Sequence, residues 1–434
     1  MSTRWMVQAS WSPGNSDTAP RQAVSRRLSV AHRPGAVGGR GGLPPAGLAV
    51  PHRAERGALI PYRAIRQYPA GKAAFETATT RETRLRKIAL FNHKGGVSKT
   101  TTVFNLGWML ANLGHRVLMV DSDPQCNLTG MVLGFKGADE LEEFYEKQGQ
   151  NTFRSGLVPA FEAQPKEIQA VKTVEVAGRP GLHLLAGDLR LSEFEVTLGL
   201  AQELSAAIGA LQNLPGSLSF LIDKTASAIS ADYVLIDMSP GLGSINQNLV
   251  VTSDYLILPT SPDVFSVMAI DSLARVLPRW KKWADQASRL PVLQQAAYPF
   301  PPPRLKILGT VVQKFRPRSG KPAKAFQKWI DEVGEAVGKR LKPAMAAEHM
   351  LLDDQTYAAA GVDASLNLAT IGDFNGLISR SQEFLTPIFA LTAPQLKSGG
   401  AVLENTEASR DRFYADFEAF ANRVIAMTED EGVK

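Results

Sequence analysis

Cysteine is almost absent from this sequence: there is one, Cys126, among 434 residues. A single thiol excludes a disulfide framework within the chain and any metal site that needs two cysteines of one chain. It is also typical of a reducing compartment. Long apolar runs are lacking too, and no segment approaches the roughly 20 apolar residues of a membrane-spanning helix. We therefore expect a cytoplasmic protein that does not associate with membranes.

Acidic residues are scarce only at the start of the chain. Residues 1–87 carry 15 Lys and Arg against 4 Asp and Glu, whereas the remaining residues carry 33 against 38. The same first 87 residues contain 9 Gly and 8 Pro and show no sustained apolar period. Such a segment buries too little apolar surface to offset its chain entropy, so residues 1–85 are predicted to be a disordered extension. A dispensable extension, a nucleic-acid-binding arm and a targeting peptide remain alternative interpretations.

From residue 86 onward, short apolar runs alternate with helical stretches. The runs with the length and context of buried strands are 87–92, 116–121, 233–237, 255–259, 305–312 and 366–371. This alternation predicts an α/β fold, a doubly wound and mostly parallel sheet with helices on both faces, whose chemistry lies at the carboxyl ends of the strands. We expect this domain over residues 86–397, with an acidic, less regular insertion at 136–180. Residues 398–434 are expected to form a helix that packs on the core or on a dimer partner.

The segment from Asn92 to Thr101 connects the first strand to the first helix. A phosphate-binding loop needs small residues whose backbone N–H groups converge on oxyanions, a following helix N-terminus, a lysine for the terminal phosphates and a hydroxyl for Mg²⁺. Lys99 and Thr100 supply the last two. The common G-x-x-x-x-G-K-[ST] pattern nevertheless fails, because His93 and Ser98 occupy both of its glycine positions.

A second lysine explains the difference. The run Lys94-Gly95-Gly96-Val97-Ser98-Lys99-Thr100-Thr101 resembles the deviant Walker A motif of the ParA/MinD family of P-loop ATPases, whose usual form is K-G-G-x-G-K-[ST]. Farther along, residues 117–125 resemble the family's A′ motif and first switch, residues 232–240 its Walker B strand and second switch, and residues 256–260 its next strand. The resemblance covers residues 86–392. It implies a P-loop fold that binds ATP and Mg²⁺ through the loop from Lys94 to Thr101.

The resemblance also implies how the phosphates and the metal ion are held. Lys99 would neutralise the terminal phosphates, while Thr100 and Asp237 would hold Mg²⁺. Asp121 would support the metal shell, and Asp123 would position or polarise the attacking water. Each of these residues lies in a motif at the end of a predicted strand.

Lys94 is the signature lysine of the family. The resemblance implies that it reaches across a nucleotide sandwich dimer to the phosphates of a second copy, where it would act as an arginine finger does. By position, Gln313 and the loop of Gly372 and Asp373 resemble the adenine-contacting regions. No Asn-Lys-x-Asp guanine signature occurs, which favours ATP over GTP.

Three residues depart from the family pattern. Ser98 replaces a glycine whose lack of Cβ lets the backbone turn closely about phosphate, and it could either add a hydroxyl donor or slow turnover. Ser239 departs from the usual Pro-Pro after the Walker B aspartate. Cys126 replaces a glycine and is interpreted as a small packed residue rather than a redox group.

The charges of two segments indicate whether the chain could bind a membrane or DNA. The C-terminal helix has an apolar stripe, but residues 404–434 contain 8 acidic and 4 basic residues, so an anionic membrane would repel it. Residues 314–342 carry a net charge of +6. Both a nonspecific DNA surface and an ordinary solvated face remain open for them. The basic face expected on a helix from about residue 321 consists of Lys321, Lys324 and Lys328.

The sequence therefore predicts an ATPase that forms an ATP-dependent homodimer and hydrolyses ATP slowly, as a switch for partitioning or positioning DNA or another cargo. An unidentified adaptor protein is expected to stimulate turnover. Two alternatives remain: an ATP-dependent small-molecule ligase or kinase of the same superclass, and a nonhydrolysing nucleotide-dependent binding module.

Overall fold

A computed structural model describes residues 84–135, 138–148, 151–204, 207–318, 321–397 and 400–429. The predicted extension at 1–85 lies outside these residues except for its last two positions. Eight strands form one sheet in the order β10-β7-β6-β1-β5-β2-β4-β3, in which all neighbours run parallel except β3 and β4. These strands are β1 (Arg86–Leu90), β2 (Val117–Asp121), β3 (Val174–Glu175), β4 (Leu182–Leu185), β5 (Tyr233–Asp237), β6 (Tyr255–Thr260), β7 (Lys306–Phe315) and β10 (Asn367–Gly372).

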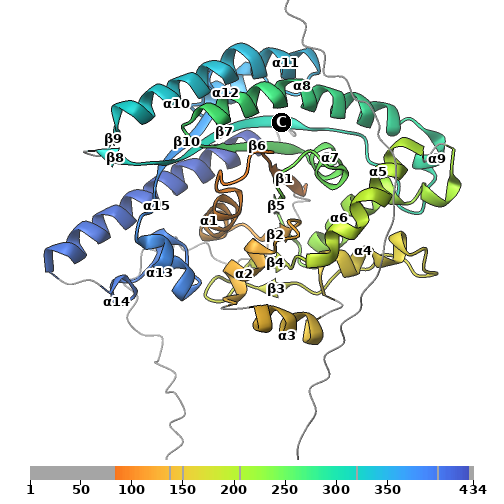
Figure 1. Cartoon of the computed structure of the whole chain (residues 1–434), viewed down its shortest axis with the longest axis horizontal. Coiled ribbons are helices and arrows are strands. Elements are labelled where there is room, and N and C mark those ends of the chain that lie inside the picture. Colours follow the sequence, from red (N-terminus) through yellow and green to blue (C-terminus); the bar gives the residue numbers. More distant parts are fainter. Residues whose placement is uncertain are drawn as a thin grey trace, which may run out of the picture. The chain divides into compact units, whose positions relative to one another are not determined.

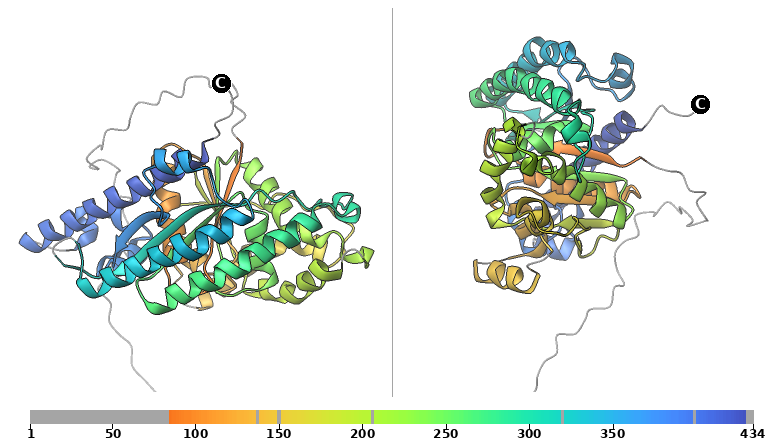
Figure 2. Two further views of the ribbon diagram at one scale, coloured as in Figure 1. Left: turned by 90° about the horizontal axis from the view of Figure 1, so that it is seen from above. Right: turned by 90° about the vertical axis from the view of Figure 1, so that its right-hand side faces the viewer.

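Helices cover both faces of this sheet. In Figure 1, α1 and α15 lie to the left of the central strands and α6 and α7 to the right, and Figure 2 shows the same layers from two other sides. The helices are α1 (Lys99–Asn112), α2 (Asn127–Leu133), α3 (Ala138–Gln148), α4 (Phe153–Phe161), α5 (Glu195–Leu204), α6 (Leu214–Ala228), α7 (Ser244–Val251), α8 (Val264–Ala287), α9 (Pro291–Gln294), α10 (Lys324–Ala336), α11 (Lys342–Ala347), α12 (Asp354–Ala359), α13 (Leu377–Phe384), α14 (Ala393–Leu396) and α15 (Gly400–Thr428).

The predicted fold class is confirmed, and each of the six predicted strands is present as β1, β2, β5, β6, β7 or β10. Apolar residues fill the central strands because helices cover both of their faces, and every residue of β2 and β5 is buried. Strands β3 and β4, which follow β2 in the order of the sheet, were not predicted from the sequence. Neither was the small hairpin of β8 (Pro317–Arg318) and β9 (Lys321–Pro322).

The C-terminal helix packs against its own chain. Helix α15 runs along α1 and β10, and its apolar stripe is buried there because the aromatic side chains fill the space between helix and sheet. The buried side chains of this stripe are Phe413, Phe417, Phe420 and Val424. Among the described helices, none combines the length and the apolar character needed to cross a membrane.

The insertion at 136–180 contains regular structure. It holds α3, α4 and the short strand β3. Helix α4 begins at a capping box in which the Thr152 side chain accepts a hydrogen bond from the Ser155 backbone and the Ser155 side chain accepts one from the Thr152 backbone. The insertion thus adds helices and the edge strand β3 at the end of the sheet formed by β4 and β3.

Candidate functional site

The loop between β1 and α1 is built to hold an anion. Helix α1 begins at Lys99 with no side-chain cap and no acidic residue in its first turn. The positive end of the helix dipole and the unpaired backbone N–H groups are therefore left to the loop. Gly96 and Ser98 both adopt positive φ, 74° and 62°. These two left-handed residues turn the backbone so that exposed Gly95 and Gly96 lie at the rim of the loop.

A cavity of about 1520 Å³ opens over this loop. Its walls come from the loop and from the carboxyl ends of β7 and β10, so the structure brings Gln313, Gly372 and Asp373 to the same cavity as the phosphate loop. Lys94 alone, among the residues predicted to contact the nucleotide, does not line it. The predicted residues that do are Gly95, Gly96, Val97, Ser98, Lys99, Thr100, Thr101, Gln313, Gly372 and Asp373.

Lys99 lies at the floor of the cavity. Its ammonium donates to the backbone oxygen of Asn92 at 3.1 Å, and its side chain is buried. Burial lowers the pKa of Lys99, while the charges of Asp237 and then Asp123 oppose that shift. Lys99 is thus a cation with a neutral hydrogen-bond acceptor and two carboxylates nearby, placed to bind the phosphates of a ligand.

Asp237, the last residue of β5, has both carboxylate oxygens buried without a hydrogen-bond partner. Burial raises its pKa well above 3.8, and the nearby Asp121 raises it further, whereas Thr100 and Lys99 lower it. A buried carboxylate without partners needs a counter-ion, and a hydroxyl beside a carboxylate is a donor set that suits Mg²⁺. The residues present therefore fit a magnesium ion shared with phosphate oxygens. The described residues hold no cluster of three or more His, Cys, Asp or Glu suited to a metal on its own.

Asp121, the last residue of β2, and Asp123, in the loop after it, differ in their surroundings. Both oxygens of Asp121 accept hydrogen bonds: Oδ2 from the Thr129 backbone and hydroxyl at 2.8 and 2.6 Å, and Oδ1 from the Asp123 backbone at 3.2 Å. Burial is the main cause that raises the pKa of Asp121 to about 6. Asp123 lines the cavity, and its Oδ1 accepts from the Gln125 backbone at 2.9 Å. Asp123 is placed to meet a ligand, whereas the metal-shell role of Asp121 stays a prediction.

Lys94 is folded back onto its own chain. Its ammonium lies 2.5 and 2.7 Å from the carboxylate oxygens of Asp263 and donates to the Ser266 hydroxyl at 3.1 Å. Asp263 also caps α8, where it accepts from the Ser266 backbone at 2.9 Å. In the single chain, Lys94 is therefore held outside the cavity that its neighbours line.

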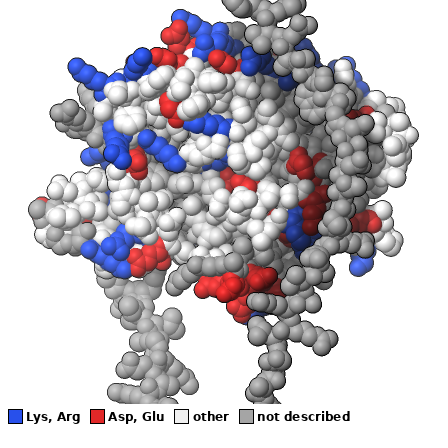
Figure 3. All heavy atoms as spheres, in the orientation of Figure 1, with Lys and Arg blue, Asp and Glu red and all other residues white. Residues whose placement is uncertain are grey.

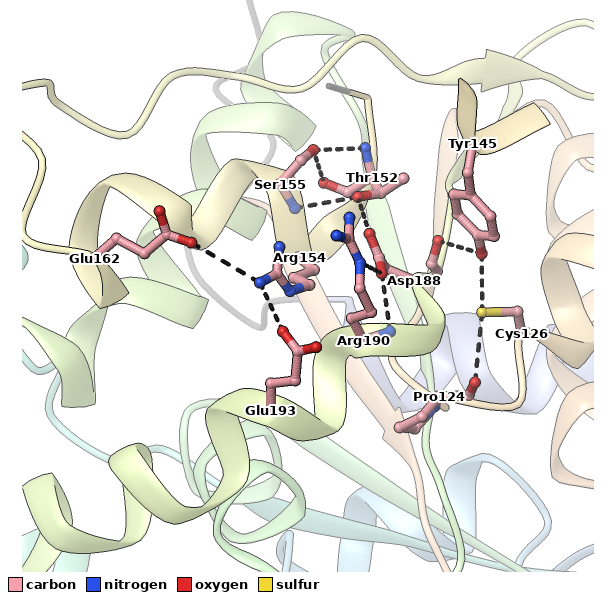
Figure 4. Close-up of polar contacts among 11 residues, drawn as sticks. Pro124, Cys126, Tyr145, Thr152, Arg154, Ser155, Glu162, Asp188, Arg190 and Glu193 are labelled. Atoms are coloured by element: carbon pink, nitrogen blue, oxygen red, sulfur yellow. Dashed lines mark hydrogen bonds and ion pairs between the residues drawn. The ribbon is translucent and has the colours of Figure 1, made fainter. Parts of the chain in front are cut away.

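The insertion contacts the loop that follows Asp123. Figure 4 shows Tyr145 of α3 pointing toward Cys126, with its hydroxyl 3.1 Å from the sulfur and donating to the Gly187 carbonyl at 3.0 Å. The Gly187 backbone donates to the Thr129 hydroxyl, which itself donates to Asp121. Cys126 is buried, and burial raises the pKa of its thiol to about 12, so it packs as a neutral thiol.

Other polar contacts tie α4 to the end of β4. Asp188 accepts from the Thr152 hydroxyl at 2.9 Å, and Figure 4 shows Arg154 between two carboxylates. The Arg154 guanidinium lies 2.8 Å from Glu193 and 3.8 Å from Glu162. These contacts fix the insertion to the segment that carries Gly187.

The predicted basic helix begins later than the sequence indicated. Helix α10 begins at Lys324, and Lys321 lies in β9 before it, because the chain first forms the β8–β9 hairpin. The expectation that the three lysines share one helical face is therefore wrong for Lys321. Lys324 and Lys328 are exposed, with Lys328 3.7 Å from Glu332. Figure 3 shows Lys and Arg gathered over this end of the molecule and Asp and Glu over α3.

Asp263, Tyr145 and Lys314 are not among the site residues predicted from the sequence. Lys314 lines the cavity and donates to the Gly96 carbonyl at 2.8 Å. Asp263 directly precedes a long helix, and an aspartate in that position predicts an N-cap. Its pairing with Lys94 depends instead on how β1 and β6 lie side by side. No local pattern points to Tyr145 or Lys314.

Comparisons with known proteins agree with this geometry. Residues 85–288 match the AAA_31 family, described as an AAA domain. The chain is 30% identical over 200 residues to the chromosome partitioning protein ParA of Caulobacter vibrioides, which covers 45% of this chain and 63% of that protein. It is 31% identical over 186 residues to the sporulation initiation inhibitor protein Soj of Bacillus subtilis, covering 43% and 62%.

Among solved structures, protein DIP2308 from Corynebacterium diphtheriae has the same fold, with a TM-score of 0.51 and 19% identity over 79% of this chain and 99% of that one. The chain spans less than two thirds of the length of the ParA and Soj proteins. The segment matched by the family contains the phosphate loop, the A′ motif and the Walker B strand. Over the segment that carries these motifs, the chain is therefore similar to ParA/MinD-like P-loop ATPases.

Proposed function

We propose that this chain binds ATP and Mg²⁺ in the cavity over the α1 loop and hydrolyses the ATP as a switch that controls its dimerisation. The observation that carries the proposal is the buried, unpartnered carboxylate of Asp237 beside Lys99 at the uncapped end of α1. A carboxylate, a lysine, a hydroxyl and a helix N-terminus at one point are the set needed to hold a metal-bound triphosphate. The residues on β7 and β10 then receive the base.

Hydrolysis in this proposal depends on Asp123. Its carboxylate faces the cavity from the loop after β2, where it would orient a water molecule toward the terminal phosphate. Lys99 balances charge on the transferring phosphoryl group, and Thr100 with Asp237 holds the metal ion, which when bound neutralises charge on the phosphate oxygens. Turnover in the single chain is expected to be slow, because its second loop lysine, Lys94, lies outside the cavity.

The surface around Lys94 supports a homodimer as the active form. Lys94 contacts the start of α8, where apolar side chains are exposed, at 65% for Phe265 and 60% for Met268. Val264 and Leu242 are also more than 40% exposed. A second copy seated here would bury these side chains and bring Lys94 to the neighbouring nucleotide.

Partitioning or positioning of DNA or another cargo is the use we propose for this switch. Support comes from the similarity to a protein named for chromosome partitioning and from the basic surface over α10. We propose that the dimer binds DNA nonspecifically and that an adaptor protein stimulates hydrolysis. A ligase or kinase would require a second substrate in the same cavity.

The proposal is tested by mass measurement in solution with ATP and Mg²⁺, with ADP, and without nucleotide. Of these three states, wild type is expected to dimerise only in the one with ATP and Mg²⁺. Asp123→Ala should accumulate as the ATP dimer because hydrolysis no longer releases it, and Lys94→Ala should stay monomeric while still binding ATP. Oligomers of equal size in all three nucleotide states would overturn the switch.

A parallel measurement of phosphate release separates the alternatives. Wild type with ATP and Mg²⁺ alone should release phosphate, and Asp123→Ala should not. A binding module would hold ATP and dimerise without release. Release that requires an added small-molecule acceptor would instead indicate a ligase or kinase.

A further inference from the structure

Lys314 occupies a strained backbone position at the carboxyl end of β7. Its φ is +64°, in the left-handed region that a lysine rarely adopts. The pairing of β7 with β10 skips it: Gln313 pairs with Ile371 and Phe315 with Gly372. Lys314 is thus the extra residue of a β-bulge in a parallel pair, where bulges are rare. Bulges next to functional sites re-aim a side chain, and strain of this kind persists where the surrounding structure requires it.

The bulge directs Lys314 over the phosphate loop. Its ammonium donates to the Gly96 carbonyl at 2.8 Å, although 218 residues separate the two in sequence. The side chain is exposed and lines the cavity, between the loop on one side and Gly372 with Asp373 on the other. Its position is therefore between the proposed phosphate and base regions.

Lys314 lacks the carboxylate partner that Lys94 has. Within the described part of the chain it forms no ion pair. Lys94, by contrast, lies against Asp263. Glu383, which also lines the cavity, is already paired with Lys397 and Arg380. A cation whose hydrogen bond goes to a neutral carbonyl keeps its charge available to an anionic ligand.

We propose that Lys314 is a further nucleotide-binding residue, which supplies a second cation to the phosphate chain from within the same protomer. The inference rests on the proposed function, because it requires a nucleotide in this cavity. It gives the strained bulge a purpose: the left-handed turn is retained because it carries the ammonium to the loop. The ligand it recognises is a nucleoside di- or triphosphate rather than the base or ribose.

Binding of ATP, ADP and adenosine by the full chain, measured by calorimetry, tests this proposal. Lys314→Met should weaken ATP and ADP binding about tenfold or more, the effect of losing a charge-assisted hydrogen bond, and leave adenosine unchanged. Lys314→Arg should retain most of the affinity. Lys314→Gln keeps a donor for Gly96 without the charge, so it should bind as weakly as Lys314→Met.

Lys314→Gly distinguishes the effect of the side chain on ATP binding from the effect of the backbone conformation on stability. Glycine adopts positive φ without strain, so this variant should unfold at higher temperature than wild type while it binds ATP more weakly. Lys166→Met, at an exposed position outside the cavity, makes the same charge change and should bind as wild type does.

The possible results distinguish two failures. If wild type binds no ATP, the proposed function itself fails. If wild type binds ATP and Lys314→Met or Lys314→Gly binds it equally well, only the role of Lys314 is overturned. Recovery of full affinity by Lys314→Gln would likewise overturn it, since that result assigns Lys314 to loop positioning through Gly96.

Discussion

Ser98 and Cys126 adopt left-handed backbone conformations at positions where the ParA/MinD family has glycine. Their side chains differ in what they contact. Ser98 has a φ of 62° and makes no capping hydrogen bond, whereas Cys126 has a φ of 52° and contacts the Tyr145 hydroxyl. A Cβ in this conformation costs about 1 kcal/mol. The same backbone strain is thus uncompensated at one position and compensated at the other.

Ser98→Gly is therefore expected to raise the free energy of unfolding by about 0.5–1 kcal/mol, since relief of strain outweighs the added entropy of the unfolded chain. Urea denaturation measures this. Cys126→Gly is the matched control and should gain nothing, because it also loses the contact with Tyr145. Equal gains for both variants would contradict this account of the loop.

The buried carboxyl of Asp121 predicts a dependence of stability on pH. Its pKa is about 6 in the folded chain, raised from 3.8 mainly by burial. The folded state binds this proton more tightly than the unfolded state, so the stabilisation is present below about pH 4 and is lost as the pH rises through 6. Asp121→Asn removes this titration. The unfolding free energy of the variant, relative to wild type, should rise by up to about 3 kcal/mol between pH 4 and 7.

Urea denaturation of both proteins at intervals across that range provides the measurement. The variant also loses hydrogen bonds to Thr129, which shifts its stability by a constant amount at every pH. Only the slope therefore bears on titration, and it includes the change at Asp237, whose pKa the Asp121 charge also raises. A difference between the two proteins that stays constant with pH would contradict the raised pKa.

The ion pair of Lys94 with Asp263 competes with the role proposed for Lys94 across the dimer. Asp263→Asn removes the charge but keeps an oxygen that can cap α8. The pair is partly exposed, at 19% and 39%, so it is worth no more than about 1 kcal/mol. Because both protomers must release Lys94, the variant should form the ATP dimer at a protein concentration up to about thirtyfold lower than wild type. Sedimentation at graded concentrations measures this, and weaker dimerisation would show that Asp263 helps rather than opposes the dimer.

At the scale of elements, the sequence predicted the strands that form the centre of the sheet because their buried runs are continuous and end at motifs. It did not predict β4, a run of four residues beyond the insertion, nor the β8–β9 hairpin that delays α10 to Lys324. Lys94 and Asp263, or Tyr145 and Cys126, meet only when distant elements pack. Such pairs leave no periodic signal along the chain.

Helix α10 carries the prediction about DNA. Replacing both Lys324 and Lys328 by Ala should weaken binding of duplexes of any sequence and lower the slope of log affinity against log salt by about 2, since each phosphate contact contributes about 0.9. Fluorescence anisotropy over a salt series, with ATP and Mg²⁺ present, measures the slope. Lys339→Ala is a suitable control because the ion pair of Lys339 with Glu335, at 2.7 Å, is closer than that of Lys328 with Glu332, at 3.7 Å. An unchanged slope in the double variant would make this an ordinary solvated face.

At the scale of the whole molecule, the parts proposed to face the nucleotide come from strand ends far apart in the chain. The motifs predicted the phosphate side because each requires particular residue types at fixed spacing, as Lys99, Asp123 and Asp237 illustrate. The residues expected to contact the base were predicted only from their position in the sequence. The structure brings Gln313 and Gly372 to the same cavity as the phosphate loop. The ion pair of Lys94 with Asp263 could not be predicted, because it forms between elements far apart in the sequence.

The central claim is that each nucleotide is served by Lys94 of the opposite protomer and by Asp123 of its own. Mixing Lys94→Ala with Asp123→Ala tests it most directly, because a heterodimer then has one complete site and one that lacks both residues. Each variant alone should release almost no phosphate. The equimolar mixture should recover up to about half of the wild-type rate, since Lys94→Ala dimerises only with the other variant and each mixed dimer has one working site of two. A mixture as inactive as its components would contradict the account.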